Sequence, residues 1–146
     1  MSSLKLTALD SADLEIISAH MQDAVITIGD IRFLKASGKF ALIANRFLWQ
    51  TEKPPYERRR TGLHFDRVLE AKSQRIRQGA DDAVLSLLSV SFTPGEEPSG
   101  KIVLTFSGGG AITLKVECIE ARLEDLGPAW ETPNLPSHDR ETPGSR

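Results

Sequence analysis

The stretch Asp23–Phe33 (DAVITIGDIRF) returns 59 residues later, without a gap, as Asp82–Phe92 (DAVLSLLSVSF). Residues of this kind are typical of strands. Each copy is followed by a Ser-Gly-Lys turn, at Ser37–Lys39 and at Ser99–Lys101, and then by a second apolar run, FALIANRF or IVLTF. The pattern predicts strand, turn and strand in both places.

The two copies predict an internal repeat of one β-meander, over residues 11–72 and 73–126. Further along, Leu69–Lys72 (LEAK) echoes Ile119–Arg122 (IEAR). The spacing between the copies drifts from 59 to 62 and then to about 50 residues. Because short strands draw on few residue types, chance similarity is the alternative interpretation. Either way the expectation is a fold rich in antiparallel strands.

One segment has the spacing of a helix. Leu14, Ile17 and Met21 recur every three to four residues, and Asp10 or Ser11 can cap the free N–H groups before them. We therefore expect a helix over Ser11–Gln22. The core is expected to contain the following apolar side chains: Leu14, Ile17, Met21, Val25, Phe33, Phe40, Leu42, Phe65, Leu87, Phe92, Leu104, Leu114 and Val116.

The strands are expected over residues 25–34, 40–49, 84–92, 101–106 and 111–118, with another beginning at Leu63. The segment 51–60 is expected to be a loop, because Pro54-Pro55 does not suit a central strand. Residues 119–126 are compatible with either a strand or a short helix. The fold class predicted is α+β, a mainly antiparallel sheet of six to eight strands with an N-terminal helix.

The chain of 146 residues is 40% apolar and 26% charged, which favours a single globular domain over residues 1–130. Residues 131–146 are rich in proline and polar side chains, so this tail is expected to be disordered. The start of the chain lacks the pattern of a signal peptide. No apolar stretch approaches the roughly 20 residues that span a bilayer. With the single Cys118, these features predict a cytoplasmic protein that does not bind membranes.

A basic segment is the first candidate site. Residues 46–75 hold eight Arg or Lys against four acids, whereas residues 81–146 hold five against eleven. Guanidinium groups fit phosphates and aromatic faces stack on bases. The anion-binding hypothesis assigns this role to the following side chains: Arg46, Arg58, Arg59, Arg60, Trp49 and Tyr56. The alternative is that Trp49 is core and the arginines are solvated or paired with acids.

A second candidate pairs His64 with Asp66, which lie two apart on a predicted strand and therefore on one face. They could serve as a base and its orienting carboxylate. The alternative is an incidental ion pair on a solvated face. No metal-binding spacing is present, and Gly108–Gly110 lacks the Lys-Ser/Thr of a phosphate loop, so no cofactor is predicted.

Four longer stretches carry a resemblance: SAHMQDAVITIGDIRFL (18–34), FALIANRFLWQ (40–50), RRRTGLHFDRV (58–68) and GGGAITLKVECIEARLEDLGPAW (108–130). Together they resemble the uncharacterised alphaproteobacterial family called domain of unknown function 2948, over about residues 4–130. The resemblance implies a bacterial cytoplasmic protein. It supplies no activity, cofactor or catalytic residue.

The leading functional hypothesis is a non-catalytic binding or protein-interaction module, because no nucleophile with a base, metal set or phosphate loop is recognisable. One alternative is a small-molecule binder or small enzyme with a pocket between the two halves. Another is anion or RNA binding through residues 46–75. An exposed edge strand would also allow a homodimer.

Overall fold

The computed structural model describes residues 3–48, 56–77 and 79–132. The predicted disorder of the tail therefore lies, from residue 133 onward, outside the described residues. The elements follow one another in this order: β1 (Lys5–Ala8), α1 (Ser11–Met21), β2 (Val25–Leu34), the 3-10 turn η1 (Lys35–Ser37), β3 (Lys39–Phe47), β4 (Tyr56–Phe65), β5 (Val68–Gln74), β6 (Val84–Pro94), β7 (Gly100–Phe106), the 3-10 turn η2 (Ser107–Gly109), β8 (Ala111–Val116), β9 (Ala121–Asp125) and β10 (Trp130–Thr132).

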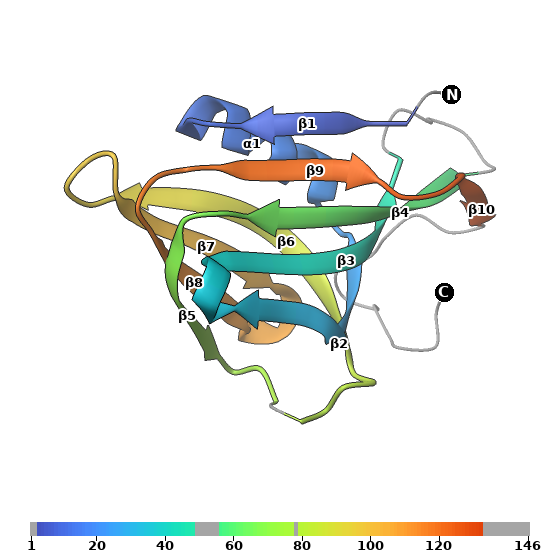
Figure 1. Ribbon diagram of the computed structural model, residues 1–146. Coiled ribbons are helices and arrows are strands. Elements are labelled where there is room, and N and C mark those ends of the chain that lie inside the picture. Colours follow the sequence, from blue (N-terminus) through green and yellow to red (C-terminus); the bar gives the residue numbers. More distant parts are fainter. Residues whose placement is uncertain (1–2, 49–55, 78, 133–146) are drawn as a thin grey trace.

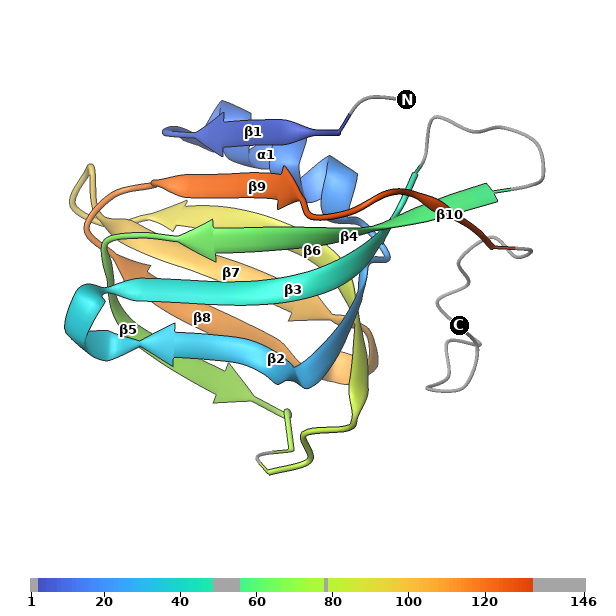
Figure 2. The same cartoon turned by 45° about the vertical axis from the view of Figure 1, so that its right-hand side comes forward.

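The strands form two facing layers (Figures 1 and 2). The front layer has the order β1-β9-β4-β3-β2, and pairing of β2 with β6 continues it into a back layer ordered β6-β7-β8-β5. Every pairing among the described strands is antiparallel. The predicted α+β class, with a mainly antiparallel sheet and a helix near the N-terminus, is confirmed.

The predicted count of six to eight strands is wrong. Within the described residues nine strands follow one another in the sheet, and the short β10 pairs with β4 beside that path. Part of the predicted loop 51–60 belongs to β4, which begins at Tyr56. After β4 the chain turns at Arg67, whose φ of 60° is left-handed, and continues as the separate strand β5. The ambiguous segment 119–126 contains a strand, β9, because Ala121, Leu123 and Asp125 alternate inward.

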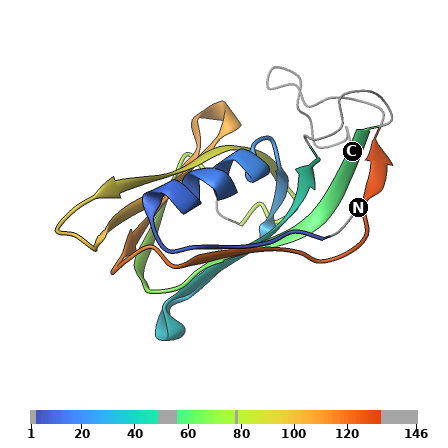
Figure 3. The ribbon, with the colours of Figure 1, turned by 90° about the horizontal axis from the view of Figure 1, so that it is seen from above.

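Helix α1 lies between β1 and β6 in the view from above (Figure 3). It begins where expected, with the Asp10 carboxylate accepting a hydrogen bond of 2.8 Å from the backbone N–H of Asp13. Its buried face consists of Leu14, Ile17 and Met21. No helix of the described residues has both the length and the apolar character that crossing a membrane requires.

The core fills the space between the two layers and the helix. Eleven of the thirteen predicted core residues are buried. Phe33 and Phe92 are only partly buried, although both pack against the core. Each of these two side chains lies near the hairpin end of its strand, where the layers leave it open to solvent.

When β1 and β10 are set aside, each layer has four strands, in the order β9-β4-β3-β2 in the front layer and β6-β7-β8-β5 in the back layer. Strands β2 to β5 form one set of four and β6 to β9 form the other, and each set gives its last strand to the other layer. At the centre, Ile26 of β2 pairs with Leu85 of β6. These two residues are 59 apart, which is the offset between the two similar stretches of sequence, and their antiparallel pairing relates β2 and β6 by a local twofold axis.

The registers of the two sets agree. Phe33 pairs with Phe40 in the first set, and Phe92 pairs with Ile102 at the equivalent place in the second. The next two ladders also correspond. The pair Phe40–Phe65 between β3 and β4 matches Ile102–Leu114 between β7 and β8. The pair Phe65–Ala121 between β4 and β9 matches Leu114–Ala71 between β8 and β5. Helix α1 has no counterpart among the described residues of the second set.

Candidate functional site

Two arginines of the basic segment point into the molecule. Arg46 on β3 and Arg59 on β4 are directly opposite each other in the ladder, and their side chains are 4% and 8% exposed. Like charges at directly opposed positions repel. Asp125 on β9 lies between them: Arg46 Nε and Nη2 donate to its two carboxylate oxygens, both at 2.9 Å, and Arg59 Nη1 donates at 3.4 Å. The carboxylate offsets the repulsion of the arginine pair.

Asp125 joins four segments of the chain at this point. Besides the two arginines, the Thr61 hydroxyl donates to its carboxylate at 2.8 Å, and the backbone N–H of Leu4 donates at 2.7 Å. Burial alone would raise the pKa of Asp125, but the hydrogen bonds from Arg46, Leu4 and Thr61 outweigh it and hold the pKa at about 2. The carboxylate is therefore ionised at neutral pH and connects β1, β3, β4 and β9.

His20 at the end of α1 lies in the field of this cluster. Burial is the largest cause that lowers its pKa, the positive charge of Arg46 lowers it further, and Asp125 acts in the opposite direction. The imidazole is neutral at pH 7 as a result. Burial and the charge of Arg46 are therefore the two causes of the lowered pKa of His20.

Two other members of the basic segment, Arg58 and Tyr56, meet on the ring of Phe47. Arg58 is buried, its Nη1 donates to the carbonyl of Asn45 at 3.0 Å, and its guanidinium lies 5.6 Å from the ring centre of Phe47. Tyr56 is half-buried and packs on the same ring, at 5.7 Å between centres. Arg60 is exposed. Trp49 lies outside the described residues.

Three of the four arginines assigned to an anion-binding face are thus buried. The geometry brings Arg46 and Arg59 together, but around Asp125 rather than at the surface. Arg60 is the exposed member of the set. Anion binding by the segment stays a prediction.

His64 and Asp66 lie together on the outer face of the front layer. His64 Nε2 is 3.5 Å from one oxygen of Asp66, and Lys39 Nζ is 3.7 Å from the other. Both partners of the His64–Asp66 pair are about 30% exposed. A hollow of about 600 Å³ beside Asp66 is lined by Lys35, Arg67, Glu117 and Glu120, among others, and His64 does not line it.

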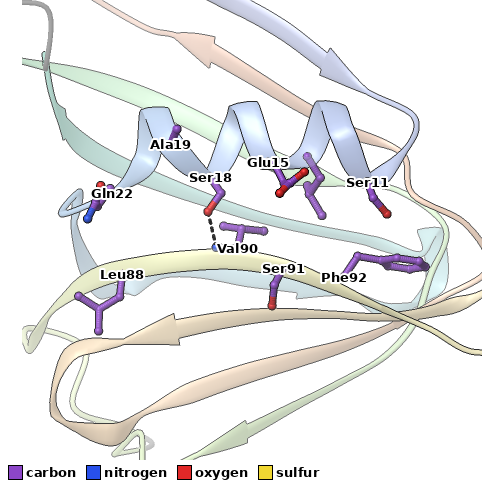
Figure 4. A pocket seen from close by; sticks show the side chains of 10 residues that line it. Ser11, Glu15, Ser18, Ala19, Gln22, Leu88, Val90, Ser91 and Phe92 are labelled. Atoms are coloured by element: carbon purple, nitrogen blue, oxygen red, sulfur yellow. Dashed lines mark hydrogen bonds between the residues drawn. The ribbon is translucent and has the colours of Figure 1, made fainter.

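A groove of about 610 Å³ separates α1 from β6 (Figure 4). Ser11, Glu15, Ser18 and Gln22 line its helical side, as the figure shows. Halfway along, the Ser18 hydroxyl oxygen accepts a hydrogen bond of 2.9 Å from the backbone N–H of Val90. Beyond Ser86, β6 has no strand partner on this side among the described residues. Ser18 therefore covers a polar group on an open strand edge.

The outward face of α1 is apolar rather than polar. Leu9, just before the helix, is 65% exposed and Ile16 is 50% exposed, and the small side chains of Ala12 and Ala19 are exposed as well. The positions 12, 16 and 19 follow helical spacing and so form one stripe, and Leu9 lies just before the N-cap residue Asp10. We call these four residues the α1 stripe. The acids Asp10, Asp13 and Glu15 flank it, and α1 contains no Lys or Arg.

Among the described residues no group of three or more His, Cys, Asp or Glu side chains could hold a metal ion. In the buried cluster Arg46 and Arg59 both bind the Asp125 carboxylate, so the cluster connects the strands that carry these residues. Sequence reasoning missed Asp125 and Thr61. The alternation of Ala121, Leu123 and Asp125 would have placed Asp125 inward once the segment was taken as a strand.

The fold defines an α+β protein built on a two-layer antiparallel sheet. The model of the family described as a protein of unknown function (DUF2948) matches residues 4–138, and the chain belongs to that family. The resemblance noted in the sequence is confirmed, and it extends eight residues beyond residue 130. No curated protein and no solved structure matches the chain.

Proposed function

We propose that this protein is a non-catalytic interaction module that docks a partner protein on the α1 stripe. The observation that carries the proposal is the exposure of Leu9 and Ile16 on the outward face of the helix. A surface helix of a globular protein normally presents polar residues there. An exposed apolar surface of this kind, with a polar rim, is typical of interaction sites.

The composition of the stripe favours a helical partner. Ala12 and Ala19 are one heptad apart with Ile16 between them, so a second helix can approach closely over the alanines and pack against the isoleucine. Burying an Ile side chain contributes about 1.5–3 kcal/mol, enough to make Ile16 the anchor.

The charges around the stripe favour a basic partner. The N-cap residue Asp10 and the helix residues Asp13 and Glu15 are three acids, and α1 contains no Lys or Arg to balance them. Charge complementarity of this kind speeds association and selects against acidic surfaces. The proposed partner segment is an amphipathic helix with an apolar stripe and basic flanks.

Ile16→Glu tests the proposal, with Leu34→Glu as the matched control. Leu34 is 52% exposed, against 50% for Ile16, and lies at the end of β2, away from α1. Proteins captured from native cells by the tagged wild-type chain are compared with those captured by each variant, and the Kd of the purified partner is then measured. Binding should weaken at least tenfold in Ile16→Glu only. Equal binding by both variants would overturn the assignment.

A small-molecule site is the second candidate, favoured by an opening between β2 and β5. The cavity there holds about 290 Å³, near the lower end of ordinary ligand sites, and Ile31, Phe33, Phe40, Ile76 and Ile112 are among its apolar lining. Filling it with Ala71→Trp should abolish binding of any fragment found by ligand-observed NMR. A fragment whose binding survives this change would bind elsewhere.

Anion or RNA binding through residues 46–75 is a weaker proposal, because it now rests mainly on the exposed Arg60. Titration with single-stranded RNA at low salt, comparing the wild type with Arg60→Ala, tests it. A cytoplasmic location is supported by the single cysteine and by resemblance to alphaproteobacterial proteins. We also infer that the chain arose by duplication of one β-meander, a proposal supported by the matching registers of the two sets.

A further inference from the structure

Two lysines face each other on the outer surface of the back layer. Lys101 on β7 is directly opposite Lys115 on β8, and both side chains are exposed. Their neighbours Ile102, Leu114 and Val116 point inward, which fixes the lysines on the outward face. Within the described residues no carboxylate oxygen lies within 4.0 Å of either ammonium nitrogen.

In the first set of strands, β2 to β5, the equivalent lysine has an acidic side chain beside it. Lys39, next to Phe40 on β3, is equivalent to Lys101, and Asp66 directly follows Phe65, the cross-strand partner of Phe40. Lys39 Nζ and Asp66 Oδ1 are 3.7 Å apart. The second half has Lys115 where the first half has the Asp66 carboxylate.

The two lysines differ on their other sides. Thr93 of β6 is opposite Lys101, whereas Glu70 of β5 is the direct cross-strand partner of Lys115. The Glu70 carboxylate lies 3.1 Å from Lys72 Nζ, and its pKa is lowered first by the hydrogen bond from Lys72, with a smaller contribution from the charge of Lys115. Like charges at opposed positions are destabilising. The pair therefore gains from an anion placed between the two nitrogens.

A hollow of about 620 Å³ opens at the same place. Both lysines line it, together with the apolar side chains of Leu69, which is 49% exposed, and Pro94. Glu96 is the acid of the lining, and it leaves the hollow with a net charge of +1 from two lysines and one glutamate. The equivalent hollow beside Asp66 is lined instead by three acids and two bases.

We propose that Lys101 and Lys115 bind the phosphate group of a phosphate monoester whose apolar part lies against Leu69. A phosphate monoester carries about −1.5 to −2 charges at pH 7, which balances two ammonium groups. Lysine binds phosphate as a point charge and needs no fixed fork geometry. The anion takes the position that Asp66 holds in the other half. This site is separate from the α1 stripe.

Titration with phenyl phosphate and with inorganic phosphate, followed by ¹⁵N NMR at low salt, tests the site. Shifts should concentrate on β7 and β8, and phenyl phosphate should bind more tightly because Leu69 contacts its ring. Lys101→Gln and Lys115→Gln should each weaken binding roughly tenfold or more. Lys39→Gln is the matched control and should leave the Kd unchanged. Binding that survives both glutamine changes, or no binding of either probe, overturns the proposal.

Exchanging the residues between the halves gives a second readout. Lys115→Asp recreates the Lys39–Asp66 arrangement, so it should abolish phosphate binding. Asp66→Lys should create a second site beside Lys39. Phosphate binding that survives Lys115→Asp, or no second site in Asp66→Lys, contradicts the reasoning. Vesicles of phosphatidylcholine with and without phosphatidic acid distinguish a lipid headgroup from a free monoester as the source.

Discussion

Replacing Asp125 by Asn should destabilise this protein more than any surface change. The asparagine keeps the shape of the side chain, but its single oxygen can take the place of only one of the two carboxylate oxygens that accept from Thr61 and from the N–H of Leu4. It removes the negative charge that lies between the buried guanidinium groups of Arg46 and Arg59. Removing one partner of a buried charge pair costs about 3–5 kcal/mol, because the remaining charge is left uncompensated.

The pH dependence gives an independent magnitude. The pKa of Asp125 is lowered from 3.8 to about 2 in the folded state. At about 1.4 kcal/mol for each pKa unit, the ionised carboxylate contributes about 2 kcal/mol. Since the folded pKa is depressed, this stability is fully present above pH 3.8 and is lost as the pH falls toward 2. His20, whose pKa is also lowered, adds a loss of stability as the pH falls below 6.5.

Urea unfolding and thermal melts measure both effects. Asp125→Asn should lower the melting temperature by roughly 6–20 °C at pH 7. Its stability should also decline less steeply than that of the wild type between pH 4 and pH 2. The control is Glu124→Gln on the same strand, whose partner Lys5 is 3.6 Å away at the surface, and it should cost less than about 1 kcal/mol. Equal melting temperatures for the two variants would refute the argument.

Three further changes test the packing. Gly100→Ala places a Cβ 2.5 Å from a backbone oxygen, so it should cost about 1–3 kcal/mol, whereas Gly127→Ala has open space and should leave the melt unchanged. Phe33→Ala and Phe92→Ala should each cost about 3 kcal/mol, near the lower end for buried Phe because both are partly exposed; an unchanged melt in both would contradict their contact with the core. Deleting residues 133–146 should preserve the melting temperature, since that segment is polar and rich in proline, and a large loss would show that it packs on the fold.

The sequence predicted the parts that depend on local pattern. The spacing of Leu14, Ile17 and Met21 located α1, and the repeated stretch at Asp23 and Asp82 located β2 and β6. Local pattern was less informative where the chain changes direction. Arg67 adopts a left-handed φ that its residue type does not announce, although the slip in apolar alternation at Arg67-Val68 indicates a bend between β4 and β5.

The candidate site was predicted only in part. The pairing of His64 with Asp66 follows from their spacing on one strand, and the structure places them 3.5 Å apart. The direction in which the arginines of the basic segment point could not be predicted in the same way. Whether Arg46 and Arg59 face outward depends on Asp125, which is 79 and 66 residues away in the chain.

By itself the sequence determined the secondary structure of most of the chain, the two-part pattern and the family, because these depend on residue order and local periodicity. The tertiary structure decided which charges meet. Exchange of the last strand between the two sets brings β9 beside β4, which buries Asp125 between two arginines. The same exchange brings β5 beside β8. Strand pairing over long separations fixes such contacts, and no local pattern encodes them.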